Sequence, residues 1–134
     1  MEQFETFSVE QWTRIAESHP QKENGHVWTG IKKMQKRKAP VSYTGLRVGD
    51  EVVGAYVITH FRDSTRLQLF DVFAAHRRKG FGKKLLQHAI SSAKLRGSSA
   101  LKIDGAIGAR AFYQACGLTP HYRNGYDTYI VGLE

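Results

Sequence analysis

The stretch HRRKGFGKKLL, residues 76–86, sets Gly80 and Gly82 among basic residues on both sides. The stretch RLQLFDVF (residues 66–73), in which apolar residues predominate, comes before it, and leucines at helical spacing come after it. This order predicts a β-strand that bends through a basic, glycine-bearing loop into an α-helix. Such a loop leaves backbone N–H groups unpaired at the positive end of the helix dipole, a geometry that binds anions and above all phosphate. We therefore predict an anion site, with a solvated run of charge as the alternative.

Two common phosphate-binding motifs do not fit this stretch. A Walker loop needs four residues between its glycines and then Lys-Ser/Thr, whereas Phe81 alone separates Gly80 from Gly82. The dinucleotide fingerprint needs a third glycine where Leu85 stands, and it usually opens a fold instead of following several strands. Both motifs are therefore excluded.

The composition is that of one globular domain spanning residues 1–134. Hydrophobic residues make up 41% of the chain and charged residues 24%, which excludes a disordered protein. No apolar run approaches the roughly 20 residues that a membrane span needs, and the first residues carry acids where a signal peptide carries bases. The lone Cys116 excludes an intrachain disulfide, so we expect a cytoplasmic protein. The net charge of +8 leaves phosphates, nucleic acid or an acidic surface as partners.

Hydrophobic periodicity and turn residues divide the chain into alternating elements. Helices are predicted at 9–18 after an N-cap at Ser8, from His26 to about Arg37, from the glycine loop to Gly97, and over 109–116 before Gly117. Strands are predicted at 41–48, 52–61, 66–73 and 99–103, followed by a hairpin over 121–133 that turns at Asn124-Gly125.

The predicted order is ααβββαβαββ, and QFETF (residues 3–7) is a candidate for one more strand before the first helix. Residues 66–103 read as a strand, helix and strand, which is the pattern of a crossover between parallel strands. The fold class is therefore α/β, with one mixed sheet of about six or seven strands flanked by about four helices.

Two motifs in the second half of the chain carry a family resemblance. The first is Arg77-x-x-Gly80-x-Gly82, between a strand and a helix, and the second is ARAFYQACGL at residues 109–118. They resemble the coenzyme A loop, Gln/Arg-x-x-Gly-x-Gly/Ala, and the A-x-x-F-Y-x-x-x-G-F helix of the GNAT superfamily of acyl-CoA-dependent N-acetyltransferases. The resemblance covers residues 43–134, and it extends to the two N-terminal helices by element order alone.

The resemblance implies an acetyl-CoA cosubstrate, no metal, and an amine acceptor that is either a small molecule or a protein. It implies that the backbone near Val72 and Phe73 pairs with the pantetheine, and that an N–H near Val72 polarises the thioester carbonyl. Tyr113 would lie beside the sulfur and protonate the departing thiolate, unless it is only a core aromatic. The pyrophosphate would bind the loop formed by Arg77, Arg78, Lys79, Gly80, Phe81, Gly82 and Lys83.

The general base is the weak point of this resemblance. Many family members carry a glutamate near the position of Arg66, and an arginine cannot serve as a base. Asp71, on the face of its strand opposite to Phe70, and His60 are the remaining candidates. Family members without such a base deprotonate the amine through water.

Three functions are therefore compared. The leading one is an N-acetyltransferase that works by direct attack of a primary amine. The second is a non-catalytic acetyl-CoA sensor that engages a protein partner, suggested by the absent base and by Ala106, where the family often has asparagine. The third, nucleic-acid binding, rests on charge alone and is not expected.

Two further features bear on the partners of the chain. The run KKMQKRK at 32–38 either recruits an acidic acceptor or is the solvated face of a helix. Cys116 is predicted to pack in the core instead of accepting an acyl group. A monomer and a homodimer both remain open.

Overall fold

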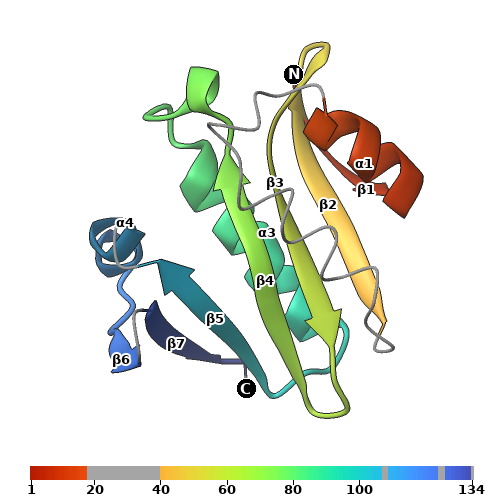
Figure 1. Cartoon of the computed structure of the whole chain (residues 1–134). Coiled ribbons are helices and arrows are strands. Elements are labelled where there is room, and N and C mark those ends of the chain that lie inside the picture. Colours follow the sequence, from red (N-terminus) through yellow and green to blue (C-terminus); the bar gives the residue numbers. More distant parts are fainter. Residues whose placement is uncertain (18–39, 107–108, 124–125, 134) are drawn as a thin grey trace.

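A seven-stranded mixed sheet organises the chain, in the order β1-β2-β3-β4-β5-β7-β6 (Figure 1). The computed structural model describes residues 1–17, 40–106, 109–123 and 126–133. The predicted helix from His26 to about Arg37, the basic run at 32–38 and the turn at Asn124-Gly125 lie outside these residues. The strands are β1 (Glu2–Phe7), β2 (Val41–Val48), β3 (Glu51–His60), β4 (Ser64–Val72), β5 (Ala100–Ala106), β6 (His121–Arg123) and β7 (Tyr126–Gly132).

Strands β4 and β5 run parallel, and every other described pair of neighbours is antiparallel. Parallel neighbours need a crossover, which the helix α3 (Phe81–Leu95) supplies. The candidate strand at QFETF is present as β1. The predicted α/β class and mixed sheet are therefore confirmed.

Three α-helices occur in the described residues, against about four predicted: α1 (Val9–Glu17), α3 and α4 (Arg110–Ala115). The start of α1 is a capping box, because the Gln11 N–H donates to Ser8 Oγ at 3.1 Å and the Ser8 N–H donates to Gln11 Oε1 at 2.9 Å. Gly97 and Gly117 adopt the left-handed conformation expected after α3 and α4, with φ of 88° and 85°.

The sheet has a hydrophobic cluster on each face. Helix α3 covers one face with the buried side chains Leu85, Leu86, Ala89 and Ala93. Helix α1 lies against the other face (Figure 1), and its Trp12 belongs to the cluster there. Strand β3 contributes side chains to both clusters. Ala55 and Val57 belong to the cluster under α1 (the α1 cluster), whereas Tyr56 and Ile58 belong to the cluster under α3 (the α3 cluster).

Gly54 permits the close approach of α3 to the sheet. It lies opposite Val72 of β4, and a Cβ at this position would stand 2.7 Å from Leu85 Cδ1 and 2.8 Å from the Asp71 carbonyl oxygen. Any side chain here would push the helix or the strand away, and both of them carry residues of the site described below.

We predict that Gly54→Ala lowers the free energy of unfolding by about 1–3 kcal/mol, because the added methyl group overpacks this contact. Gly132→Ala is the matched control on β7, where nothing lies within 4 Å of the built Cβ, and we expect a change within about 0.5 kcal/mol. Urea denaturation measures both values. Equal stability of the two variants would contradict the packing described for Gly54.

Candidate active site

Strands β4 and β5 separate beyond Leu67. Their pairing runs from Ser64 opposite Ala100 to Leu67 opposite Ile103 and then stops, although both strands continue. At the same point the register between β3 and β4 shifts, because Val57 faces Leu69 and Ile58 faces Leu67. Gln68 is therefore the extra residue of a β-bulge, which bends its strand and increases the local twist. The bulge at Gln68 therefore directly follows Leu67, where β4 and β5 begin to splay apart.

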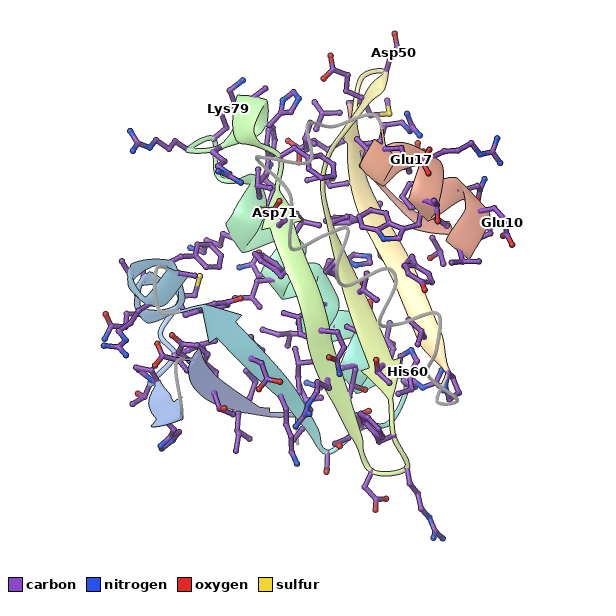
Figure 2. All side chains as sticks on the ribbon, in the orientation of Figure 1. Glu10, Glu17, Asp50, His60, Asp71 and Lys79 are labelled. Carbon is purple, nitrogen blue, oxygen red and sulfur yellow. The ribbon has the colours of Figure 1, made fainter. Side chains whose placement is uncertain are left out.

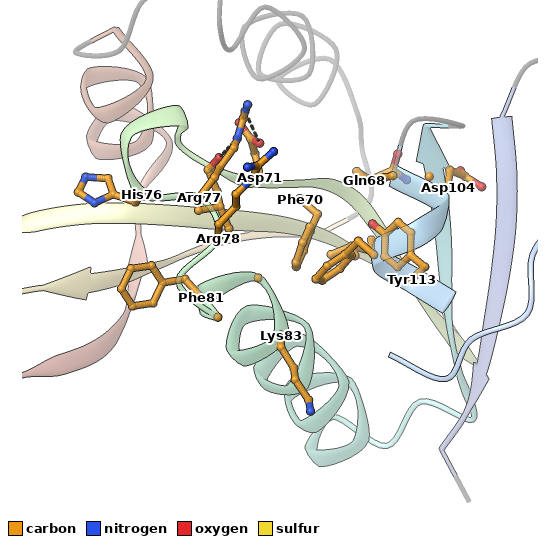
Figure 3. A pocket seen from close by; sticks show the side chains of 17 residues that line it. Gln68, Phe70, Asp71, His76, Arg77, Arg78, Phe81, Lys83, Asp104 and Tyr113 are labelled. Carbon is orange, nitrogen blue, oxygen red and sulfur yellow. Dashed lines mark hydrogen bonds and ion pairs between the residues drawn. The ribbon is translucent and has the colours of Figure 1, made fainter. Parts of the chain in front are cut away.

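A cavity of about 800 Å³ opens where the two strands diverge (Figure 3). It extends from the start of α3 to α4. The residues that line it are Leu67, Gln68, Phe70, Asp71 and Val72 of β4, His76, Arg77, Arg78, Gly80, Phe81, Gly82 and Lys83 around the loop, Asp104 and Gly105 of β5, and Ala109, Phe112 and Tyr113 around α4.

The main chain of Val72 faces this cavity. Val72 lies opposite Gly54, and the next hydrogen bond runs from the Phe73 N–H to the Val53 carbonyl at 2.9 Å. In an antiparallel ladder this pattern makes Val72 and Gly54 a non-hydrogen-bonded pair, whose N–H and C=O groups point away from each other. The Val72 N–H therefore points to the side on which β5 has left the sheet.

Phe73, predicted beside Val72 as a coenzyme contact, is turned away from the cavity. Its side chain is buried in the α1 cluster, its N–H donates to Val53, and its carbonyl accepts from the His76 N–H at 2.8 Å. Neighbouring residues of a strand direct their main-chain groups to opposite sides. Of the two predicted residues, the structure brings only Val72 to the cavity.

The loop enters α3 through Gly80, the N-cap residue, which has a φ of 84°. Arg78 is also left-handed, with a φ of 65°, a conformation that is uncommon for a residue with a side chain and is found in ligand-binding loops. Gly80 provides no side-chain cap, so the first N–H groups of α3 keep their capacity to bind an anion.

A glycine in such a loop can serve by adopting a positive φ, but Gly82 does not. It is not among the glycines with positive φ, because it already lies inside α3. A Cβ at Gly82 would stand 3.0 Å from Cε1 of Phe112. The glycine therefore makes room for an aromatic ring of α4 against the first turn of α3, and the requirement for positive φ applies to Gly80 alone.

The cations of the loop divide into two groups. Arg77 folds back on the strand, where its Nε donates to the Val72 carbonyl at 2.8 Å and its guanidinium pairs with Asp71 at 3.3 Å (Figure 3). Arg78, Lys79 and Lys83 are exposed, and no ion pair with another described residue is found for them. Arg77 therefore closes the loop onto β4, while the exposed side chains are available for an anion.

Tyr113 lies at the other end of the cavity on α4, with 4% of its surface exposed. Its ring packs against Tyr129 with 4.6 Å between centroids, and against Phe112 at 5.1 Å. Burial is the main cause that raises the pKa of Tyr113 above its ordinary value. The phenol therefore stays protonated at neutral pH and can act only as a proton donor.

The two candidate bases lie in different places (Figure 2). Asp71 lines the cavity and pairs with Arg77, and its side chain projects from β4 on the side opposite to Phe70, as predicted (Figure 3). His60 ends β3 and faces Thr65, six residues before Asp71 on β4. At about 3.3 Å per residue this separation is roughly 20 Å. The structure therefore does not bring His60 to the cavity.

His60 is buried, and its Nε2 lies 3.0 Å from Ser42 Oγ. Burial, with a smaller contribution from Arg96, lowers the pKa of His60, and burial also lowers the pKa of His88, which packs against Phe4. Both histidines therefore favour the neutral form in the folded chain.

Several lining residues were not singled out from the sequence. Gln68 at the bulge, Asp104 on the facing wall and Phe112 are the clearest cases. The polar Gln68 between the apolar Leu67 and Leu69 was the available signal. Cys116, predicted as a packing residue, packs against the α3 cluster and is a partly buried free thiol.

The site is that of an acyl-CoA-dependent transferase: a splayed parallel pair, a glycine loop entering a helix, and an aromatic helix facing it. The chain matches the model of the acetyltransferase (GNAT) family over residues 2–118, and it belongs to that family. This confirms the resemblance drawn from the two motifs. The cosubstrate of the family is acetyl-CoA.

Individual relatives agree with this assignment. The chain is 36% identical to the uncharacterised N-acetyltransferase YvbK of Bacillus subtilis (strain 168) in an alignment 73 residues long, which covers 52% of this chain and 47% of that protein. The match thus spans about half the length of this curated relative.

Two solved structures share the fold. The ribosomal-protein-S18-alanine N-acetyltransferase of Escherichia coli superposes with a TM-score of 0.77, at 18% identity, over 97% of this chain and 91% of that one. The PaiA N-acetyltransferase of Thermoplasma acidophilum, solved in complex with coenzyme A, gives a TM-score of 0.70 at 15% identity over 97% of both chains.

None of the described helices has the length and apolar character that crossing a membrane requires. In the part of the chain that the structure describes, no group of three or more His, Cys, Asp or Glu side chains is arranged to hold a metal ion.

Because His60 and His88 favour the neutral form when folded, stability should fall as the pH drops below about 6.5, the ordinary pKa of histidine in the unfolded chain. In that range the unfolded chain binds more protons than the folded chain. Each histidine contributes a slope of at most about 1.4 kcal/mol per pH unit.

We expect His60→Asn to weaken this dependence between pH 7.5 and 5.5, measured by urea denaturation at constant ionic strength. His121→Gln, at an exposed position, is the control and should keep the wild-type dependence. A wild-type dependence in His60→Asn would show that this histidine is not held neutral.

Proposed function

We propose that the chain transfers the acetyl group of acetyl-CoA to a primary amine of a small molecule or protein by direct attack, with Tyr113 as general acid. The observation that carries the proposal is the placement of three groups on one cavity: the start of α3, the unpaired edge of β4 at Val72, and the phenol of Tyr113. Acetyl transfer from acetyl-CoA needs these three functions: binding of the pyrophosphate anion, polarisation of the thioester carbonyl and donation of a proton to the leaving sulfur.

The residues present fit the coenzyme. The N–H groups at the start of α3, with the exposed Arg78 and Lys83, offer an electropositive site for the pyrophosphate. Val72 offers the edge of a strand to the amide groups of the pantetheine. When bound, acetyl-CoA supplies a thioester carbon for the amine to attack.

The reaction then needs three groups from the chain: a hydrogen-bond donor to the thioester oxygen, an acid for the sulfur and an acceptor for the amine proton. As the amine attacks, negative charge develops on the thioester oxygen, and the Val72 N–H can donate a hydrogen bond to it. Tyr113 donates its proton to the departing sulfur, and with a pKa raised by burial the phenol is protonated at neutral pH, as this step requires. Asp71 stays the candidate for accepting the amine proton, since it lines the cavity and His60 does not.

The first experiment tests the loop. Gly80→Ala places a side chain where φ is 84°, at a cost of roughly 1–2 kcal/mol if the conformation is kept, so the loop should shift and lose the anion geometry. We expect the rise in melting temperature with acetyl-CoA to shrink strongly. Gly49→Ala, in the turn between β2 and β3 with a φ of 61°, carries the same strain away from the cavity and should keep the full rise.

An undiminished shift in Gly80→Ala would remove the anion site from the proposal. Equal losses in Gly80→Ala and Gly49→Ala would assign the effect to general destabilisation instead of the loop.

The second experiment tests the acid. Tyr113→Phe keeps the ring that packs on Tyr129 and removes the proton donor, so kcat should fall by about a hundredfold while KM for acetyl-CoA stays nearly constant. Steady-state release of coenzyme A across a panel of amines measures it. Wild-type turnover in this variant would make Tyr113 a core residue. Binding of acetyl-CoA without turnover of any amine or protein by the wild type would favour the sensor function.

A further inference from the structure

Asp127 on β7 is a completely buried carboxylate, with 0% of its surface exposed. Arg110 at the start of α4 binds it with two parallel hydrogen bonds, from Nε to Oδ2 at 2.9 Å and from Nη2 to Oδ1 at 2.8 Å. This bidentate geometry is the strongest form of an arginine–carboxylate contact. The two residues join helix α4 to strand β7.

A buried carboxylate is costly unless it is paired and hydrogen-bonded. The hydrogen bonds from Arg110 lower the pKa of Asp127. The carboxylate therefore remains ionised at neutral pH and keeps its hold on the guanidinium. The pair does not line the cavity and takes no part in the proposed proton transfers. A buried ion pair at this place therefore needs a different explanation.

Helix α4 depends on such outside contacts for its position. It has six residues, far fewer than the 12–15 or so at which an isolated helix becomes even marginally stable. Arg110 precedes Tyr113 by three residues, a spacing that sets the two side chains on neighbouring parts of one helix surface. Fixing the guanidinium of Arg110 therefore fixes the turn that carries the phenol.

A second contact connects the same carboxylate to Tyr113. Tyr129 donates a long hydrogen bond of 3.5 Å from its hydroxyl to Asp127 Oδ2, and its ring lies 4.6 Å from that of Tyr113. Gly105 makes this packing possible, since a Cβ there would stand 2.9 Å from Tyr113 and 3.1 Å from Tyr129. Asp127 therefore contacts helix α4 through Arg110, and it also contacts Tyr129, whose ring packs against that of Tyr113.

We propose that the Arg110–Asp127 pair positions Tyr113, holding its phenol at the cavity in the place from which it donates its proton. The catalytic part of this inference rests on the proposed function of Tyr113. Asp127 and Arg110 are positioning residues that act through Tyr113 and touch no substrate.

The test compares Asp127→Asn and Arg110→Lys with the wild type. Asp127→Asn removes the charge at constant shape, and Arg110→Lys keeps the charge but loses the two-pronged contact. We expect kcat to fall by about tenfold or more in each, because displacement by about 1 Å costs up to 10²-fold, while the acetyl-CoA dissociation constant changes less than about twofold. Circular dichroism confirms folding at the assay temperature, and Arg110→Lys keeps the test valid if Asp127→Asn does not fold.

Glu5→Gln is the matched control. Glu5 accepts two hydrogen bonds from Arg47 at 2.7 and 3.3 Å between β1 and β2, away from the cavity, so its loss should leave kcat unchanged. In the Tyr113→Phe background, Arg110→Lys should cause no further loss of kcat, because there is no proton left to position. Equal losses in the two backgrounds, or an unchanged kcat in both pair variants, would overturn the proposal.

A readout without catalysis separates this inference from the proposed function. With tyrosine labelled at ¹³Cζ, the Tyr113 resonance should move in Arg110→Lys and stay in place in Glu5→Gln. If Tyr113→Phe keeps wild-type turnover, the acid function fails while this shift still reports on positioning. An unmoved resonance in Arg110→Lys would overturn the positioning itself.

Discussion

The end of the β4–β5 pairing at Leu67 is the constraint on which the rest of the site depends. Backbone N–H and C=O groups of a sheet interior are obligatory hydrogen-bonding groups, and a strand that loses its neighbour must find other partners for them. Beyond Leu67 the outward groups of β4 meet an open cavity instead of β5. The Val72 carbonyl is satisfied by Arg77, and the Val72 N–H remains as a donor directed into the cavity. A ligand with amide groups can replace the missing strand.

The loop and the two ends of the cavity follow from this opening. Arg77 reaches back to Val72 and Asp71, so the turn into α3 is fixed against the strand that has lost its neighbour. Gly80 then allows α3 to begin with its N–H groups uncapped by a side chain. Gly82 lets Phe112 pack against the same first turn. The anion site and the aromatic helix α4 therefore lie at the two ends of the cavity between β4 and β5, and the phenol of Tyr113 is at the α4 end.

The sequence predicted what local chemistry determines. The N-cap at Ser8, the glycine loop that opens α3 and the glycines Gly97 and Gly117 that end two helices are properties of short segments, and the structure contains all of them. Features that depend on contacts between distant parts of the chain could not be predicted from the sequence. The bulge at Gln68 depends on how β4 pairs with two neighbours, and the distance of His60 from the cavity depends on the antiparallel register. The Arg110–Asp127 pair joins residues 17 positions apart whose partnership no local pattern reveals.

Hydrogen exchange of the Val72 amide can show whether a ligand pairs with the open edge of β4. Val72 directs its N–H into the splay, whereas the adjacent Phe73 N–H is already bonded to Val53. We expect saturating coenzyme A to slow exchange at Val72 by a larger factor than at Phe73, because the ligand pairs with the open edge of β4 whereas global stabilisation affects both amides. Slowing at Val72 no greater than at Phe73, with coenzyme A bound, would contradict the claim that the ligand takes the place of the departed strand.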